Sequence, residues 1–386
     1  MPTYILNDEE KIIQDTARRF AIERLKDGYQ ERELVPTLDR SLLREMGDLG
    51  LLTPNLSEEY GGINASSVVC GLIAEQIAYG DFNLSYLNMT NALICQVIER
   101  NASEDMKQEI LPKMAAGEII VGLGLTEPRG GSDAANLIVS AKSDGDDYIL
   151  NGEKTSISYC QQSEYLLMFV RTGEVDQGAH GVTCILCPLD AEGISTTSFN
   201  DIGTKPVGRG SVFFDNVRVP KSSRLGKEGE GFTKIMVGFD LSRIIIALQC
   251  IGAAQASIDE TWQYGLDREA FGMQLIKYQG FNFQVAEFES KVEACRTLAY
   301  HAMRLRDEGL PHTKEAAMIK WMAPKWCTDI LQACCILHGH YGYSSDFPHQ
   351  QRMRDVMGLQ IGDGTANIMK MIIARETVGH VSVQYK

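Results

Sequence analysis

The chain lacks three features that would narrow its class at once: a long apolar run, a surplus of positive charge and a targeting segment. No stretch approaches about 18 uninterrupted apolar residues, so we expect no membrane span. The N-terminal MPTYILNDEEKIIQD has no basic segment before an apolar one, so we expect no signal peptide and a cytoplasmic protein. The formal net charge of −14 argues against nucleic acid and anionic membranes as partners.

Signals for a bound metal are also missing. Ten cysteines are scattered along the chain, and Cys184 and Cys187 have the CxxC spacing without a second such pair. His338 and His340 have no cluster of Asp or Glu beside them. We therefore expect reduced cysteines in the core and no metal site.

The spacing of apolar residues divides the chain into three regions. Hydrophobic residues make up 44% of the 386 residues, enough for two or three structural units. In NDEEKIIQDTARRFAIERL the apolar residues fall three and four apart, and Asn7 or Asp8 can cap the start of this predicted helix. Helical spacing recurs through 1–120 and 236–386, whereas 121–235 has the period of two that is typical of strands.

Inside the strand region, Asn151-Gly152 predicts a tight hairpin turn between two strands. An order of helices, strands and helices argues against a doubly wound fold, in which strands and helices alternate. The glycine-rich GLGLTEPRGGSD contains no GxGxxG, so this dinucleotide-binding fingerprint is absent.

Several motifs nevertheless follow one another in an order that resembles the flavin-dependent acyl-CoA dehydrogenases. They are GLTEPRGGSD, NGEKTSIS, FFDNVRVP, FDLSR, DREAFGMQLIKYQGFNFQVAEFE, HGHYGYSSDFPHQQRMRD and IGDGTANIMKMIIARE. The resemblance implies a mainly α fold with a β-barrel middle domain. A helical N-terminal domain would span 1–120, the barrel 121–235 and a C-terminal four-helix bundle 236–386. It also implies FAD, an acyl-CoA substrate, an electron-transferring flavoprotein as acceptor, and a homo-oligomer that we expect to be a tetramer.

Asp363 stands between two glycines in IGDGT and matches the family's catalytic glutamate. The resemblance implies that this carboxylate removes the proton α to a CoA thioester. The backbone N–H at the base position would bind the thioester oxygen, which explains a flanking Gly364 because the backbone must come close. A second interpretation is that Asp363 only caps the helix entered at Thr365. Some family members place the base on the FDLSR helix, but Ser242 cannot act as one.

The remaining site residues follow from the same motifs, residue by residue. For FAD the matching positions are Leu125, Thr126 and Ser158, with Arg268, Phe271 and Gln279 contributed by a partner subunit. For the CoA ester they are Ser132, Asp240, Arg243, Tyr86, Met89, Asn91 and Gly364. Surface ion pairing of Asp240 with Arg243, and ordinary helix packing of Tyr86, Met89 and Asn91, are the structural alternatives.

The chain departs from the family's pattern at several of these motifs. Ser156 replaces the tryptophan that covers the flavin ring. In the last loop, Ile336 stands for glutamine, His340 for glycine and Gln351 for a basic residue.

The aspartate at 363 is itself a departure, since it is one methylene shorter than glutamate and holds its carboxylate about 1.3 Å further back. A ring-bearing substrate such as cyclohexanecarboxyl-CoA or cyclohex-1-ene-1-carboxyl-CoA fits that difference. Five alternatives stay open: a straight short-chain dehydrogenase, an enoyl-CoA reductase, an oxidase like the nitroalkane oxidases, a flavoprotein that acts only as a binding partner, and a helical scaffold that binds no flavin.

Overall fold

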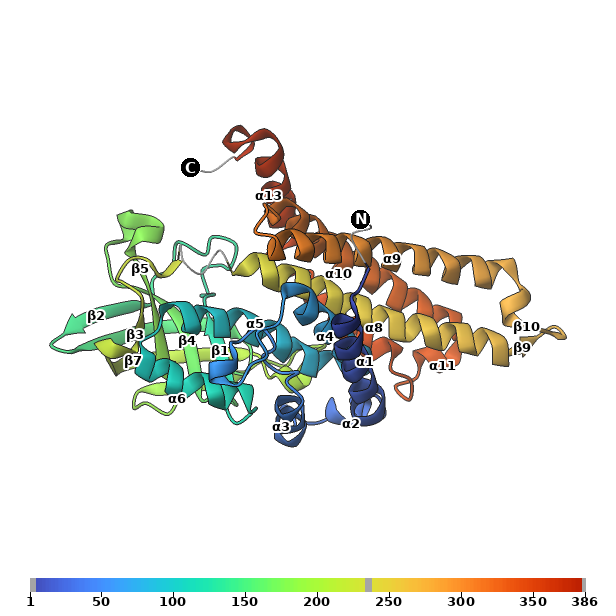
Figure 1. Cartoon of the computed structure of the whole chain (residues 1–386), viewed down its shortest axis with the longest axis horizontal. Helices are drawn as coiled ribbons and strands as arrows, with labels where there is room; N and C mark the ends of the chain where they lie inside the picture. The colour runs from blue at the N-terminus through green and yellow to red at the C-terminus, as the bar shows by residue number, and fades with distance from the viewer. Residues whose placement is uncertain (1–4, 233–237, 384–386) are drawn as a thin grey trace.

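The computed structural model describes residues 5–232 and 238–383. A helical N-terminal part and a β-sheet lie beside a long C-terminal helical bundle, as Figure 1 shows. The predicted boundary at 235/236 falls on 233–237, outside the described residues. The N-terminal helices are α1 (Asp8–Phe20), η1 (Ala21–Leu25), α2 (Tyr29–Arg32), α3 (Arg40–Asp48), η2 (Glu58–Tyr60), α4 (Ser67–Gly80), α5 (Phe82–Asn101) and α6 (Glu104–Ala115).

The predicted start of the first helix is confirmed. The Asn7 side chain accepts a 2.8 Å hydrogen bond from the Glu10 N–H, and the Glu10 carboxylate accepts a 2.9 Å bond from the Asn7 N–H. This reciprocal pair satisfies two backbone donors that a helix start leaves free. The Glu10 carboxylate also pairs with Arg304, and so attaches α1 to the C-terminal bundle.

The middle region forms one eight-stranded sheet in the order β6-β7-β3-β2-β4-β5-β8, with β1 parallel to β4. The predicted β-barrel is wrong, because β6 and β8 at the two edges do not pair among the described residues. A sheet closes into a barrel only when its first and last strands form a continuous hydrogen-bonded ladder. The edge strand β8 has only two residues, too few for such a ladder. The strands are β1 (Val121–Gly124), β2 (Ser140–Asp144), β3 (Asp147–Ile157), β4 (Tyr165–Arg171), β5 (Val182–Pro188), β6 (Ile194–Ser198), β7 (Gly210–Pro220) and β8 (Arg224–Leu225).

The predicted hairpin turn at Asn151-Gly152 is also wrong. Both residues lie inside β3, where the pairing with β7 shifts register between Leu150 and Gly152. Gly152 has φ +131° and forms part of this bulge, whose left-handed backbone favours the same residues as a tight turn. The turn that joins β2 to β3 lies instead beside Gly145, at φ +59°.

The C-terminal bundle is built around α8. This helix of 29 residues contains a window with mean hydropathy 1.5, long and apolar enough to cross a membrane by composition, but 94% of that window is buried inside the protein. It packs on α4, α5, α9 and α10 as a core helix. The elements are α8 (Phe239–Asp267), β9 (Glu269–Ala270), β10 (Met273–Gln274), α9 (Gln279–Asp307), α10 (Thr313–Leu337), α11 (His340–Tyr343), α12 (His349–Gly358) and α13 (Ala366–Val378).

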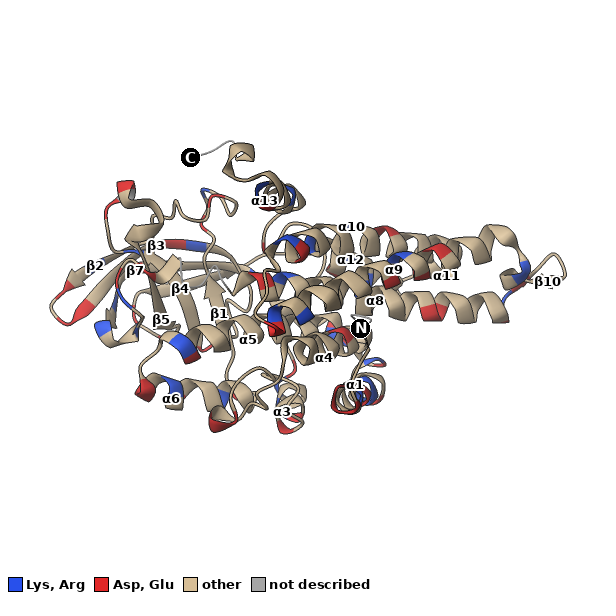
Figure 2. Cartoon of the chain, turned by 45° about the horizontal axis from the view of Figure 1, so that its top comes forward, with Lys and Arg blue, Asp and Glu red and all other residues tan. Residues whose placement is uncertain are grey.

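Polar surface and cysteine placement agree with a densely packed interior. Figure 2 shows acidic and basic residues interspersed over the helices and the sheet. All ten cysteines are free, and nine of them, including Cys184 and Cys187 on β5, are buried.

Candidate active site

Asp363 lies in the turn between α12 and α13. Its φ is +56° and that of Gly364 is +93°, so two successive residues adopt left-handed conformations. Such a conformation is uncommon for a residue with a side chain, although aspartate tolerates it better than most. At Gly364 a Cβ atom would lie 2.6 Å from Cε of Met369, so a side chain there would displace its neighbour.

This conformation leaves backbone donors available. Within 5–232 and 238–383, the N–H groups of Asp363 and Gly364 donate to no acceptor. They precede the N-terminus of α13, which carries partial positive charge. Thr365 caps that helix, since its side chain accepts a hydrogen bond from the Ile368 N–H. The interpretation that Asp363 is the helix cap is therefore wrong, and its carboxylate is free for another role.

The Asp363 carboxylate faces α8. The Ser242 hydroxyl donates a 2.7 Å hydrogen bond to its Oδ2 atom. Burial raises the pKa of Asp363, and this is the largest effect; the positive charges of Arg243 and Lys320 and the Ser242 bond act in the opposite direction. The site therefore holds a carboxyl group more basic than an exposed aspartate, as a general base requires.

Asp240 and Arg243 form an ion pair on α8, the helix that also carries Ser242. Arg243 Nη1 lies 2.9 Å from Asp240 Oδ1, and Thr313 Oγ1 on α10 donates to Asp240 Oδ2 at 2.6 Å. Both charged residues are buried, so a surface ion pair is not what the chain forms here. The buried Nε of Arg243 has no acceptor among the described residues, which leaves one donor for a ligand.

Of the three residues predicted from α5, Tyr86 comes nearest to the base. Its hydroxyl lies 3.5 Å from Ser158 Oγ, and its pKa is raised first by burial and further by the Asp363 charge. Met89 packs in the core cluster around α8, and the Asn91 amide donates to the Leu52 carbonyl at 3.4 Å. The structure thus places Tyr86 beside Ser158 and within the influence of the Asp363 charge, while Met89 and Asn91 lie buried on the same helix.

The residues matched to the flavin ring lie at the ends of β1 and β3. The Thr155 N–H donates to the Thr126 carbonyl at 2.9 Å, which places Thr126 beside the end of β3 near Ser158. Among the described residues, the N–H groups of Leu125 and Thr126 have no acceptor. Free donors and a hydroxyl on half-buried residues suit the polar edge of a flavin. The donor set therefore fits FAD.

A buried ion pair fixes this end of β1. Lys154 Nζ lies 2.7 Å from Glu127 Oε1 and 3.2 Å from the Leu125 carbonyl. The Glu127 carboxylate also accepts from the N–H groups of Ile138 and Val139. The two motifs GLTEPRGGSD and NGEKTSIS are thus held together by one residue from each.

Other predicted residues lie far from this centre. Arg268, Phe271 and Gln279 are exposed around the β9–β10 hairpin, which lies at the other end of the helical bundle from the β-sheet in Figures 1 and 2. Phe271 is 98% exposed. One chain therefore does not bring these residues to Thr126 and Ser158. Ser132 is exposed in its turn.

The positions that depart from the family's pattern differ in environment. Ile336 is 72% exposed and His340 is exposed as well. Gln351 is buried, and its amide donates to the Tyr29 carbonyl at 3.2 Å. Ser156 has φ +57° within a second register shift of β3, between Lys154 and Ile157.

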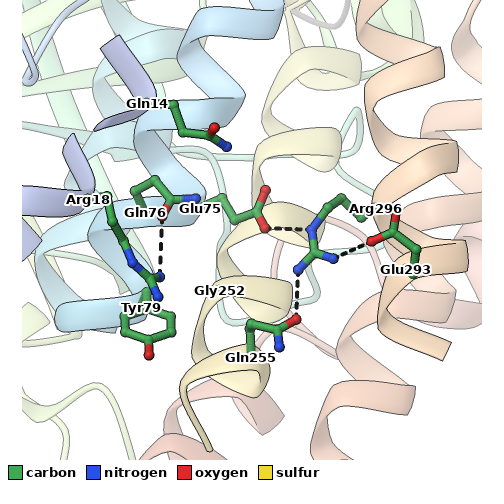
Figure 3. Close-up of a pocket in the computed structure, with 9 residues that line it drawn as sticks. All are labelled: Gln14, Arg18, Glu75, Gln76, Tyr79, Gly252, Gln255, Glu293 and Arg296. Atoms are coloured by element: carbon green, nitrogen blue, oxygen red, sulfur yellow. Dashed lines mark hydrogen bonds and ion pairs between the residues drawn. The ribbon is translucent and has the colours of Figure 1, made fainter. Parts of the chain in front are cut away.

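A separate polar pocket of about 220 Å³ lies between α1, α4, α8 and α9 (Figure 3). Its charged groups satisfy one another, since Arg296 pairs with Glu75 at 2.8 Å and Arg18 bonds Gln76 at 3.3 Å. Gln255 in its wall is 13 residues beyond Ser242 on α8, or about 20 Å along the helix. The pocket is not part of the Asp363 site.

Two residues near Asp363 were not predicted as functional, Ser242 and Lys320. A signal existed for Ser242, because the resemblance places the base of some family members on the FDLSR helix. Lys320 gave no comparable signal, because a lysine in a predicted helix is usually exposed.

Three family models match the chain in order: the acyl-CoA dehydrogenase N-terminal domain at residues 7–118, the middle domain at 122–217 and the C-terminal domain at 229–378. Among curated relatives, the 3-(aryl)acrylate reductase of Clostridium sporogenes is 31% identical over 95% of this chain and 98% of its own. The short/branched chain specific acyl-CoA dehydrogenase of Rattus norvegicus is 30% identical over 100% of this chain and 88% of its own. The caffeyl-CoA reductase–Etf complex subunit CarC of Acetobacterium woodii is 29% identical over 95% of this chain and 98% of its own.

Solved structures agree with these matches. Glutaryl-coenzyme A dehydrogenase in its glutaryl-CoA complex superposes with a TM-score of 0.94 at 30% identity, covering 99% of this chain and 98% of that one. A glutaryl-CoA dehydrogenase from Mycobacterium smegmatis in complex with FADH2 superposes with a TM-score of 0.91 at 27% identity, covering 97% of this chain and 95% of that one. The chain therefore belongs to the acyl-CoA dehydrogenase family, whose members bind FAD and oxidise or reduce a carbon–carbon bond.

Proposed function

We propose that Asp363 removes the α-proton of a CoA thioester while the β-hydrogen leaves as hydride to FAD. One observation carries this proposal: Asp363 presents a carboxylate held by Ser242 on a turn whose own N–H groups have no acceptor in the part of the chain that the structure describes. A base and an oxyanion donor thus come from the same turn.

The chain's own residues divide the work as follows. The carboxylate of Asp363 receives the proton, and the N–H groups of Asp363 and Gly364 bind the thioester oxygen as negative charge develops on it. Ser242 keeps the carboxylate directed toward the space shared with Tyr86 and Ser158. Arg243 supports the ionised form of the base.

For the substrate we propose a ring-bearing acyl-CoA, with cyclohexanecarboxyl-CoA or cyclohex-1-ene-1-carboxyl-CoA as the specific candidates. The short aspartate arm supports this class, because the α-carbon must approach the base more closely than it approaches a glutamate. The names of two relatives, an aryl acrylate reductase and a caffeyl-CoA reductase, also point to ring-bearing acids. Both names describe reduction, so an enoyl-CoA reductase is the second candidate.

We further propose that the enzyme acts in the cytoplasm as a homotetramer that exchanges electrons with an electron-transferring flavoprotein. The β9–β10 hairpin lies at the other end of the helical bundle from the β-sheet of the same chain in Figure 1, which supports a site shared by two copies. The relative that forms a complex with such a flavoprotein supports the partner.

The test is an anaerobic titration of the purified flavoprotein with cyclohexanecarboxyl-CoA, 3-phenylpropanoyl-CoA and butyryl-CoA, followed by flavin absorbance. Bleaching by a ring ester and not by butyryl-CoA supports the ring-substrate proposal. Bleaching by butyryl-CoA alone supports a straight-chain enzyme. If no ester bleaches a flavin that dithionite reduces, the proposed reaction is wrong for these substrates, and fast reoxidation by oxygen would then favour an oxidase.

A further inference from the structure

Lys320 is a buried lysine that reaches the turn carrying the base. It lies on α10 and is only 1% exposed. Its Nζ atom donates to the carbonyls of Leu359 at 2.8 Å and Gly364 at 3.0 Å. These two carbonyls bracket Asp363 in the sequence, so one ammonium group holds both ends of the turn.

Such a group is costly to bury, because an ammonium loses its hydration and two carbonyl oxygens replace it only in part. In residues 5–232 and 238–383, Nζ of Lys320 forms no ion pair at salt-bridge distance. Burial lowers the pKa of Lys320 to about 8, and the strongest opposing influence is the charge of Asp363. An apolar residue would fill the same space at lower cost.

We propose that Lys320 is a positioning residue for the reaction: its ammonium group fixes the 359–364 turn and keeps Asp363 in the carboxylate form that accepts a proton. The inference rests on the proposed function of Asp363 as the base. Lys320 itself does not touch the reacting atoms.

Ionisable groups from three helices face Asp363 and Lys320. Asp363 is faced by Arg243 and Asp240 from α8, by Lys320 from α10 and, across the site, by Tyr86 from α5. Lys320 is influenced by Asp363, Arg243 and the Cys250 thiol. Asp240 pairs directly with Arg243. Lys320 forms no ion pair with a carboxylate among the described residues, and its charge acts on Asp363 in the same direction as the larger influence of Arg243.

The test compares three variants of the holoenzyme in rapid flavin reduction over pH 5 to 9, using an ester that reduces the wild type. Lys320→Met removes charge and donor, Lys320→Gln keeps a donor without charge, and Lys325→Met removes an exposed lysine on the same helix as the control. In Lys320→Met and Lys320→Gln we expect the acid limb of the rate profile, where the rate rises with pH, to move to higher pH by about one unit. At pH values below this limb the rate of flavin reduction then falls about tenfold. Lys325→Met leaves the limb in place.

A purely structural role predicts a different result, in which Lys320→Met lowers the melting temperature and the rate but leaves the acid limb where it was. That outcome would overturn the proposal. If both Lys320 variants fail to fold, Asp363→Asn tests the same coupling without any substrate. Loss of the Asp363 charge lowers the pKa of Lys320 further, so the unfolded chain binds more protons than the folded one over a wider range.

Stability of Asp363→Asn must then rise more steeply between pH 7 and 8 than that of the wild type. Equal slopes would show that the two groups are not coupled, and would also overturn the proposal. Because this measurement uses no acyl-CoA, it can be interpreted even if the proposed reaction is wrong.

Discussion

The Ser242 hydroxyl donates a 2.7 Å hydrogen bond to the Asp363 carboxylate and so joins α8 to the turn before α13. The same hydroxyl lies 3.0 Å from the Phe239 carbonyl. A hydroxyl has one proton and gives it to one acceptor at a time, and an ionised carboxylate is the stronger acceptor. The Ser242 bond therefore favours the ionised form of Asp363.

Replacing Asp363 by asparagine should remove the base and keep the shape of the turn. We expect the flavin to bind with an unchanged absorbance spectrum and its reduction by an active ester to slow by about 10³-fold, within the range that a general base contributes. Anaerobic stopped-flow absorbance measures the rate. A variant that retains a tenth or more of the wild-type rate would show that another group takes the proton.

Ser242→Ala removes the hydrogen bond and leaves the carboxylate in place. A hydrogen bond to a charged group contributes about 1.5–3 kcal/mol, so the pKa of Asp363 should rise by roughly one unit or more. Because the base must be ionised, the acid limb of the rate profile moves to higher pH while the rate at high pH changes less. Ser290→Ala, on the exposed side of α9, is the matched control. An acid limb that stays in place in Ser242→Ala would contradict the assignment.

Asp355 connects segments that are far apart in the chain. It is fully buried and accepts hydrogen bonds from Tyr29 Oη at 2.6 Å, from Asn83 Nδ2 at 3.1 Å and from the Thr204 N–H. Burial raises its pKa to about 7 from an ordinary 3.8. The folded protein thus binds this proton more tightly than the unfolded chain, so stability falls as pH rises from about 4 to about 7.

Asp355→Asn cannot titrate, and its melting temperature should change less between pH 5 and pH 8 than that of the wild type. Thermal unfolding followed by circular dichroism at the two pH values measures the difference. The exposed Asp15→Asn variant should behave like the wild type. If Asp355→Asn and the wild type show the same change, the Asp355 carboxyl group is not protonated in this range.

A site shared between two copies predicts complementation. Arg268→Ala and Asp363→Asn each disable one part, but in a mixed pair one site carries both defects and the other carries neither. Co-expression with random pairing should restore about a quarter of wild-type activity in the whole population, and about half in the mixed pairs alone. Activity is measured on mixed pairs purified through two different tags, one on each variant. If mixed oligomers form and remain inactive, Arg268 does not complete the partner's site.

The sequence alone settled the features that depend on neighbours along the chain. The start of α1 is fixed by Asn7 and Glu10, which lie three residues apart and satisfy each other's backbone groups. Ordered motifs identified the family for the same reason, since each is a short local pattern. The hairpin predicted at Asn151-Gly152 is wrong because a bulge and a tight turn need the same left-handed backbone conformation. Only the pairing with β7, where the Asn216 N–H donates to the Asn151 side chain, shows that a bulge forms and not a turn.

Tertiary structure decided the features that depend on segments far apart. Whether the sheet closes into a barrel depends on whether its two edge strands, β6 and β8, pair with each other. A local sequence pattern does not show whether two distant strands pair. The surroundings of Asp363 come from Ser242, 121 residues away, and from Lys320, whose partner Gly364 is 44 residues away. Sequence reasoning predicts Asp363 as the base, but the basicity of its carboxylate depends on burial and on charges that only folding brings within reach.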